Sequence, residues 1–134
     1  MGTEVDRPTC LITPILLIGG QPKGFDEPFD IRTHSGKILR PMLEESGRPW
    51  RLLDLWNNQK EERKGEINSF ARAMILAALD YKYDVFVLGR YQQTRLEKAG
   101  IHLPYLPHPS SRRSKDRAIL RQTLLGNERF NNAN

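Results

Sequence analysis

Short apolar runs alternate along the chain with longer segments in which apolar residues recur at every third or fourth position. A short apolar run that is bounded by glycine or polar residues is typical of a strand buried in a sheet. Four such runs occur, and we expect strands over residues 16–18, 51–56, 84–89 and 101–106. Pro104 lies in the last run and cannot donate a ladder hydrogen bond, so this strand is expected to be an edge strand or irregular.

The segments between these runs predict helices. The clearest apolar stripe has helical spacing, and it consists of Ile67, Phe70, Ala71, Met74, Ile75, Ala78 and Leu79. Further helices are expected over residues 38–43, 91–99 and 114–125. Ser35 is a candidate N-cap for the first of these, and Gly100 and Gly126 are expected to end the other two. Residues 57–64 are interpreted as a polar loop.

Strands that alternate with helices indicate βαβ units, and therefore a parallel sheet with right-handed crossovers. A chain of 134 residues has room for one such domain, which we expect over residues 1–130, with residues 131–134 as a frayed tail. Ligands of these sheets bind beyond the carboxyl ends of the strands. The segments expected there are residues 20–29, 54–58, 89–90 and 108–113.

Composition and charge limit the possible binding partners and the cellular compartment of the protein. The net charge is +5, and residues 112–129 hold six basic and two acidic side chains. This cluster is consistent with a polyanion partner or with a solvated helix face, and charge alone does not separate the two. No apolar run approaches the roughly 18 residues of a membrane span, so no membrane association is expected. Cys10 is the only cysteine, which excludes a disulfide framework and favours a reducing cytoplasm.

One candidate for ligand-binding chemistry follows the fourth predicted strand. His108 lies between Pro107 and Pro109, which restrict the backbone, so its imidazole can be oriented at little entropic cost. The amides of Ser110 and Ser111 precede a predicted helix, and helix N-termini bind anions. The same segment is also consistent with a proline-rich turn that carries an ordinary surface histidine.

A second candidate is the loop after the first predicted strand. Gly19 and Gly20 allow a close approach of the backbone to a ligand, and Phe25 or Phe29 could stack on a planar group. The alternative is a plain turn with a core phenylalanine. The motifs of P-loop, dinucleotide-binding and serine-hydrolase sites are absent, and the three histidines lack the spacing of metal ligands. We therefore expect no metal ion and no cofactor.

Several short motifs together resemble the uracil-DNA glycosylase superfamily, and especially small glycosylase-like proteins of phages. In chain order they are residues 16–22 (LLIGGQP), 28–29 (PF), 35–39 (SGKIL), 52–55 (LLDL), 85–89 (VFVLG) and 108–110 (HPS). The resemblance covers most of the chain, from Leu16 to Leu125. It implies a three-layer α/β/α sandwich with a central parallel sheet of four strands.

The resemblance also implies roles for individual residues. His108 would hydrogen-bond the O2 atom of a pyrimidine and stabilise the negative charge that develops on the departing base. Phe29 would stack on the extruded base, with Phe25 as the second candidate, and Gly20 would let the base approach the backbone. Phosphate would be contacted by Ser110, Ser111 and Arg112. The basic cluster that follows, with Arg113 and Lys115, would add further phosphate contacts on the ground of its charge.

Two positions depart from the family pattern. Gln21 occupies a position that often holds Asp or Asn, and an amide cannot act as a base, so Gln21 could only orient the attacking water. Asp54 replaces the asparagine that reads uracil. Since a carboxylate only accepts hydrogen bonds, it would favour an amino-bearing or modified pyrimidine over uracil. Equally, Asp54 could cap its loop or pair with Arg51 or Arg90.

The segment after the His-Pro-Ser motif bears on the substrate. Residues 111–114 lack the apolar wedge with which duplex-acting members fill the gap left by a flipped base. We therefore expect single-stranded DNA, an already flipped base or a nucleotide. The leading interpretation is a DNA glycosylase-like enzyme. The alternatives are a non-catalytic nucleotide- or DNA-binding protein of the same fold, for which a protein partner is an option, and a nucleotide-level enzyme of phage DNA modification.

Overall fold

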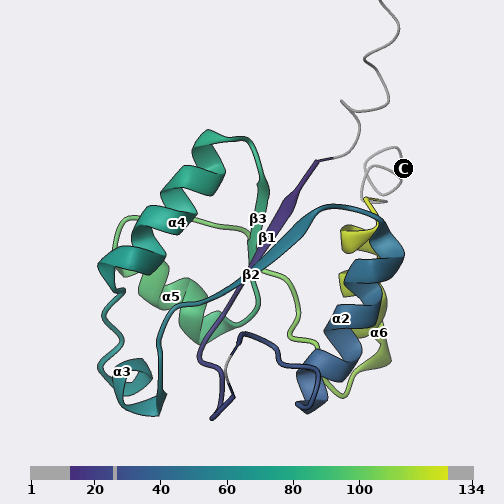
Figure 1. Cartoon of the computed structure of the whole chain (residues 1–134), viewed down its shortest axis with the longest axis horizontal. Helices are drawn as coiled ribbons and strands as arrows, with labels where there is room; N and C mark the ends of the chain where they lie inside the picture. Colours follow the sequence, from purple (N-terminus) through teal and green to yellow (C-terminus); the bar gives the residue numbers. More distant parts are fainter. Residues whose placement is uncertain (1–12, 26, 127–134) are drawn as a thin grey trace, which may run out of the picture.

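A parallel sheet of three strands lies at the centre of the computed structural model, which describes residues 13–25 and 27–126. The strands are β1 (Ile15–Gly19), β2 (Trp50–Asp54) and β3 (Asp84–Val87), in the order β2-β1-β3. The helices are α2 (His34–Ser46), α3 (Gln59–Lys64), α4 (Ser69–Asp80), α5 (Arg90–Lys98) and α6 (Ser114–Leu124). Figure 1 shows the strands between two groups of helices. The expected α/β class with a parallel sheet is confirmed.

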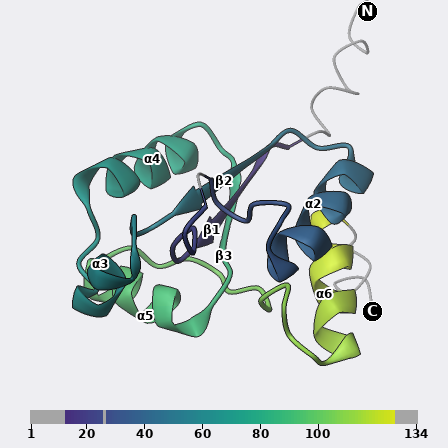
Figure 2. The same ribbon diagram turned by 60° about the horizontal axis from the view of Figure 1, so that its bottom comes forward.

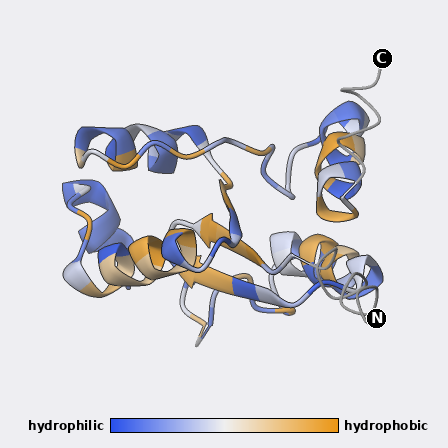
Figure 3. Cartoon of the chain, turned by 90° about the horizontal axis from the view of Figure 1, so that it is seen from above, coloured by the Kyte–Doolittle hydropathy of each residue, from blue (hydrophilic) through white to orange (hydrophobic). Residues whose placement is uncertain are grey.

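The two faces of the sheet are covered by different helices. Leu16 and Ile18 of β1 point to a core that includes Ala71 and Ile75 of α4 and Leu96 of α5. The alternate β1 residues, Ile15 and Leu17, belong to a second core, which also contains four residues of α2 and α6: Leu39, Leu43, Leu120 and Leu124. Figures 1 and 2 show these layers from two directions, and Figure 3 shows that the strands are among the most hydrophobic parts of the ribbon.

The prediction of a fourth strand is wrong. In its place, Tyr105 forms a single parallel bridge with Val87 at the edge of β3. The Val87 N–H donates to the carbonyl of Pro104 at 3.0 Å, and the Leu106 N–H donates to the carbonyl of Val87 at 3.0 Å. The pairing does not extend toward the start of β3, because Pro104 has no N–H to donate. The sheet of the described residues therefore has three strands and one added bridge.

Two expectations about helices also need correction. Thr33, and not Ser35, caps α2, because its Oγ1 atom accepts a hydrogen bond from the Gly36 N–H at 3.0 Å. The segment expected to be a polar loop contains α3, whose N-cap is Asn58. Its sequence has no apolar stripe, and none of its residues is fully buried. The polar loop was predicted because the main signal for a surface helix is absent here.

The apolar stripe of α4 is narrower in the structure than in the sequence. Ala71, Ile75 and Ala78 are buried, whereas Phe70 is 67% exposed and Leu79 is 39% exposed. None of the helices in the described ranges combines the length and apolar character that crossing a lipid bilayer requires. The expected frayed tail, residues 131–134, lies outside the described residues.

Candidate functional site

A cavity of about 110 Å³ opens at the carboxyl ends of the strands. Five residues singled out from the sequence line it: Gly20, Gln21, Phe29, Asp54 and His108. The others that line it are Pro22, Lys23, Thr33, Ser35, Glu62 and Gln92. The parallel arrangement explains this convergence, because the loops that follow β1 and β2 and the segment that follows the Tyr105 bridge all leave the sheet at the same end.

His108 is held in one hydrogen-bonding state. Its Nδ1 atom accepts a hydrogen bond from the backbone N–H of Ser110 at 3.1 Å and lies 2.7 Å from the Ser110 hydroxyl. A backbone N–H can only donate, so Nδ1 carries no proton and the neutral ring carries its proton on Nε2. Burial, and then the positive charge of Lys23, lower the pKa of His108 below its usual value. His108 therefore offers the cavity a neutral N–H donor.

Phe29 lines the same cavity in a backbone conformation that is rare for a bulky residue. Its φ angle is +48°, in the left-handed region, and its side chain is buried. The ring centroid lies 6.0 Å from that of His108, with the two planes inclined at 46°. β1 must end in glycine here, because a Cβ atom on Gly19 would lie 2.6 Å from the Phe29 ring. The left-handed backbone thus places an aromatic ring against the end of β1.

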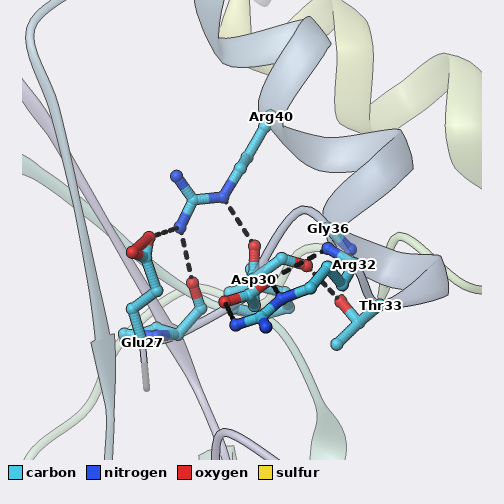
Figure 4. Close-up of polar contacts among 8 residues, drawn as sticks. Glu27, Asp30, Arg32, Thr33, Gly36 and Arg40 are labelled. Carbon is cyan, nitrogen blue, oxygen red and sulfur yellow. Dashed lines mark hydrogen bonds and ion pairs between the residues drawn. The ribbon is translucent and has the colours of Figure 1, made fainter. Parts of the chain in front are cut away.

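Arg40 of α2 braces this conformation from outside the cavity (Figure 4). Its Nε atom donates to the Phe29 carbonyl at 2.6 Å. Its Nη2 atom donates to the Pro28 carbonyl at 2.9 Å and to the Glu27 carboxylate at 2.5 Å. One guanidinium thus fixes the two peptide groups beside the strained residue, which matches the general need for surrounding support at such positions.

Asp30 continues the brace toward the start of α2 (Figure 4). Its carboxylate accepts two hydrogen bonds from the Arg32 guanidinium, both at 2.8 Å, and a third from the Arg32 N–H at 2.9 Å. The hydrogen bonds from the Arg32 side chain are the main reason why the pKa of Asp30 lies far below its usual value. The Asp30 carbonyl accepts from the Thr33 hydroxyl at 2.7 Å. Gly36 packs so closely that a Cβ atom there would lie 2.0 Å from this carbonyl oxygen.

Asp54 ends β2 in a very different environment. Its Oδ2 atom is buried and has no hydrogen-bond partner among the described residues. Burial, and then the negative charge of Glu62, raise the pKa of Asp54 to about 7. Within the described part of the chain, Asp54 forms no ion pair with Arg51 or Arg90, the partners considered from the sequence. The carboxyl group therefore faces the cavity without a fixed partner for one of its oxygens.

Glu62 and Gln92 line the cavity but were missed in the sequence. Gln21 donates from Nε2 to the Glu62 carboxylate at 3.2 Å, and its Oε1 atom accepts from the Lys23 N–H at 3.3 Å. Gln92, on α5, approaches the same loop, since a Cβ atom on Gly20 would lie 2.8 Å from its Nε2 atom. The available sequence signal for Glu62 was Asn58 as an N-cap, which would have placed a helix here.

The hydroxyls of the two serines expected to contact phosphate have hydrogen-bond partners within the fold. The Ser110 hydroxyl lies against His108, as described above. The Ser111 hydroxyl donates to the Asp116 carboxylate at 2.8 Å and accepts from the Arg113 N–H at 3.3 Å, which orders the start of α6. Three basic residues from the expected phosphate set are exposed at this end of α6: Arg112, Arg113 and Lys115.

Phe25, the second candidate for stacking on a base, is not among the residues that line the cavity. It lies in an adjoining surface groove with Gly24 and Asn57. The Arg32 guanidinium sits 4.5 Å above the centre of its ring. The structure thus separates the two phenylalanines of this loop and brings only Phe29 to His108.

Comparison of the chain with protein-family models, curated protein sequences and solved structures finds no match. Within residues 13–25 and 27–126, no three His, Cys, Asp or Glu side chains are grouped so that they could hold a metal ion. The chemistry of the cavity therefore has to be argued from its own donors, acceptors and ring.

Proposed function

We propose that the cavity binds a pyrimidine base of single-stranded or modified DNA, and that the protein hydrolyses the N-glycosidic bond of that nucleotide. The proposal places the chain beside the uracil-DNA glycosylases that its motifs resemble. The observation that carries it is the state of His108, a neutral Nε2–H donor that shares a small cavity with the ring of Phe29 and the carboxyl group of Asp54.

The reaction gives each of these groups a task. As the bond between C1′ and the base nitrogen breaks, the bonding electrons go to the base, and negative charge appears on its O2 atom. A preorganised N–H donor stabilises this charge more than it stabilises the neutral base, which lowers the barrier. Phe29 supplies an apolar face for the ring. A cavity of about 110 Å³ is close in size to the roughly 150 Å³ that holds one benzene ring in an engineered protein cavity.

We assign the activation of the attacking water to Glu62. A carboxylate can take a proton from water as the water oxygen bonds to C1′, and an amide cannot. Gln21 hydrogen-bonds Glu62 and thereby positions it, so the acid that the loop motif lacks is supplied from α3. The exposed side chains of Arg112, Arg113 and Lys115 would contact the phosphates on either side of the bound base, and this binding should weaken as salt is added.

A non-catalytic binding protein is the second candidate. The observation that favours it is that both ends of the Gln21 amide are already occupied, by Glu62 and by the Lys23 N–H. A loop fixed in this way suits the recognition of a base or nucleotide even without cleavage. A protein partner or a free nucleotide would then be the natural ligand to examine.

A base-release assay separates the two candidates. Single- and double-stranded oligonucleotides would carry uracil, cytosine, 5-hydroxymethyluracil or 5-hydroxymethylcytosine at one position. We expect release from the single strands and a loss of about 10²- to 10³-fold in the His108→Ala variant, because that variant lacks the preorganised donor. The matched control is His102→Ala, since His102 is exposed and lies away from the cavity.

Each outcome decides between the candidates. Release that disappears with His108→Ala and persists with His102→Ala supports the enzyme. If no base is released but the wild type binds a base in a manner that His108→Ala abolishes, the protein is a binding module. Absence of both release and base-dependent binding would reject a nucleobase as the ligand.

A further inference from the structure

Asp54 combines three properties that no other residue of the cavity shares. It ends β2 at the cavity wall, one of its oxygens is buried without a partner among the described residues, and a second carboxylate lies nearby on α3. We propose that Asp54 reads the base as a neutral carboxylic acid, so that the site takes both 4-oxo and 4-amino pyrimidines and loses both when Asp54 ionises. This inference rests on the proposed function and defines its substrate class.

The surroundings of Asp54 favour the protonated form of its carboxyl group. Three titratable side chains share the cavity with it, from three different parts of the fold: Lys23, Glu62 and His108. Glu62 opposes a second negative charge, and the side chain of the neutral His108 is not hydrogen-bonded to Asp54. Lys23 is exposed, and it makes no ion pair with Asp54 among the described residues. An ionised carboxylate with a buried, unpaired oxygen is costly, whereas a protonated one is tolerated.

A carboxylic acid matches two kinds of pyrimidine edge. A 4-oxo pyrimidine such as uracil presents a donor at N3 and an acceptor at O4, so the acid accepts from the N3–H and donates to O4. A 4-amino pyrimidine such as cytosine presents an acceptor at N3 and a donor at N4. The acid meets this edge by carrying its proton on the other oxygen.

The ionised form matches neither edge. A carboxylate has only acceptors, so it repels O4 of a 4-oxo base and N3 of a 4-amino base. The expectation that Asp54 favours amino-bearing bases assumed this ionised form. In the structure, burial and Glu62 raise the pKa of Asp54 to about 7, so a substantial fraction of the molecules carries the proton near neutral pH. A bound base that needs the proton would stabilise this form further.

The test measures how the contribution of the base to binding depends on pH. The probes are short oligodeoxyadenylates that carry one deoxyuridine, one deoxycytidine or one abasic analogue, with 2′-fluoroarabinose at the probe nucleotide so that the bond resists cleavage. The ratio of affinities between a base-bearing and an abasic probe isolates the base. We expect this ratio to fall about 25-fold between about pH 6.5 and about pH 8.5 for both bases, as for an acid with a pKa near 7.

Two variants sharpen this test. Asp54→Asn keeps a donor and an acceptor at every pH, so its affinity ratio should stay level across the range. Glu62→Gln removes the nearby charge and should move the midpoint of the wild-type decline to lower pH, whereas Glu66→Gln, on the exposed Glu66, should leave it in place.

The outcomes keep the two proposals separate. A base-dependent ratio that declines with pH in the wild type and stays level with Asp54→Asn supports the inference. A ratio that is independent of pH in the wild type, or a preference for cytosine that grows as pH rises, overturns it and leaves the proposed function in place. A ratio of one at every pH, in the wild type and in Asp54→Asn, overturns both.

Discussion

Two parts of the cavity differ in whether their polar groups have hydrogen-bond partners. The loop before α2 surrounds Phe29 with paired groups: Arg40 holds its carbonyl, and Asp30 is bonded to Arg32 and Thr33. Asp54, by contrast, has a buried oxygen without a partner among the described residues and lies near a second acid, Glu62. The polar groups around Phe29 are therefore paired, whereas Asp54 keeps one buried oxygen unpaired among the described residues.

We interpret the paired groups around Phe29 as a scaffold, and we propose that Asp54 is the part of the site that recognises the ligand. Buried polar groups in proteins are almost always paired, so an exception calls for a physical reason. A braced aromatic ring beside an unsatisfied acid is the arrangement expected where a planar ligand stacks on one group and hydrogen-bonds the other. The substitutions below either disrupt the hydrogen bonds and packing around Phe29 or remove the ionisable group of Asp54.

The largest effect should come from breaking the brace with Gly36→Ala. The new Cβ atom would lie 2.0 Å from the Asp30 carbonyl oxygen and 2.5 Å from that of Phe29, and both belong to backbone that cannot move alone. We expect a loss of about 3 kcal/mol or more in the free energy of unfolding, measured by urea denaturation. Gly47→Ala is the control, because Gly47 has open space around it and, unlike Gly36, a positive φ, so only about 1 kcal/mol of backbone strain should appear. Equal losses in the two variants would show that the close packing of Gly36 is unimportant.

Replacing the ionisable Asp54 with a neutral side chain, in Asp54→Asn, should stabilise the protein at high pH. The pKa of Asp54 is raised from 3.8 to about 7 on folding, so the folded state binds the proton more tightly and stability falls as pH rises through this window. The full penalty, at most roughly 4 kcal/mol, is present above about pH 7 and nearly absent at about pH 4. We expect Asp54→Asn to gain about 2 kcal/mol at about pH 8.5 and almost nothing at about pH 4. A gain that does not depend on pH would contradict the raised pKa.

The smallest effect should come from Arg40→Met, which keeps most of the apolar stem and removes the donors. The carbonyls of Phe29 and Pro28 then lose their partner, and we expect a cost of about 1–2 kcal/mol in thermal unfolding together with weaker base binding. Arg121→Ala is the control, because Arg121 pairs with Glu45 on the exposed side of α2, where little stability is at stake. If Arg121→Ala were as costly as Arg40→Met, the brace would have no special importance.

Much of the fold could be predicted from short-range patterns. The three strands and the helix α4 could be predicted from apolar runs and from helical spacing, which are local patterns in the sequence. The fourth strand could not be predicted correctly, because the same apolar pattern also fits a segment in which Pro104 lacks the N–H that further pairing with β3 needs. α3 was missed because it covers no core, so the hydrophobic signal on which the prediction relied was absent.

The candidate site was only half predictable for a related reason. Gln21 and His108 follow predicted strands and Asp54 lies near the end of one, so the topology of a parallel sheet already places them at one end. Glu62 and Gln92 reach the cavity from helices, and no local pattern marks which face of a polar helix turns toward a loop. The raised pKa of Asp54 could not be predicted from the sequence either, because it depends on burial and on the charge of Glu62, which belongs to another element.

The central claim is that His108 presents a neutral Nε2–H to a base in this cavity. The most direct test is ¹⁵N NMR spectroscopy of the histidine rings at about pH 7, before and after addition of a single-stranded oligonucleotide that carries a cleavage-resistant deoxyuridine. We expect His108 to be neutral and protonated on Nε2, and its Nε2–H signal to shift on binding, while the exposed rings of His34 and His102 stay unchanged. A His108 ring that is charged, that is protonated on Nδ1, or that does not respond to any base-bearing oligonucleotide would contradict the claim.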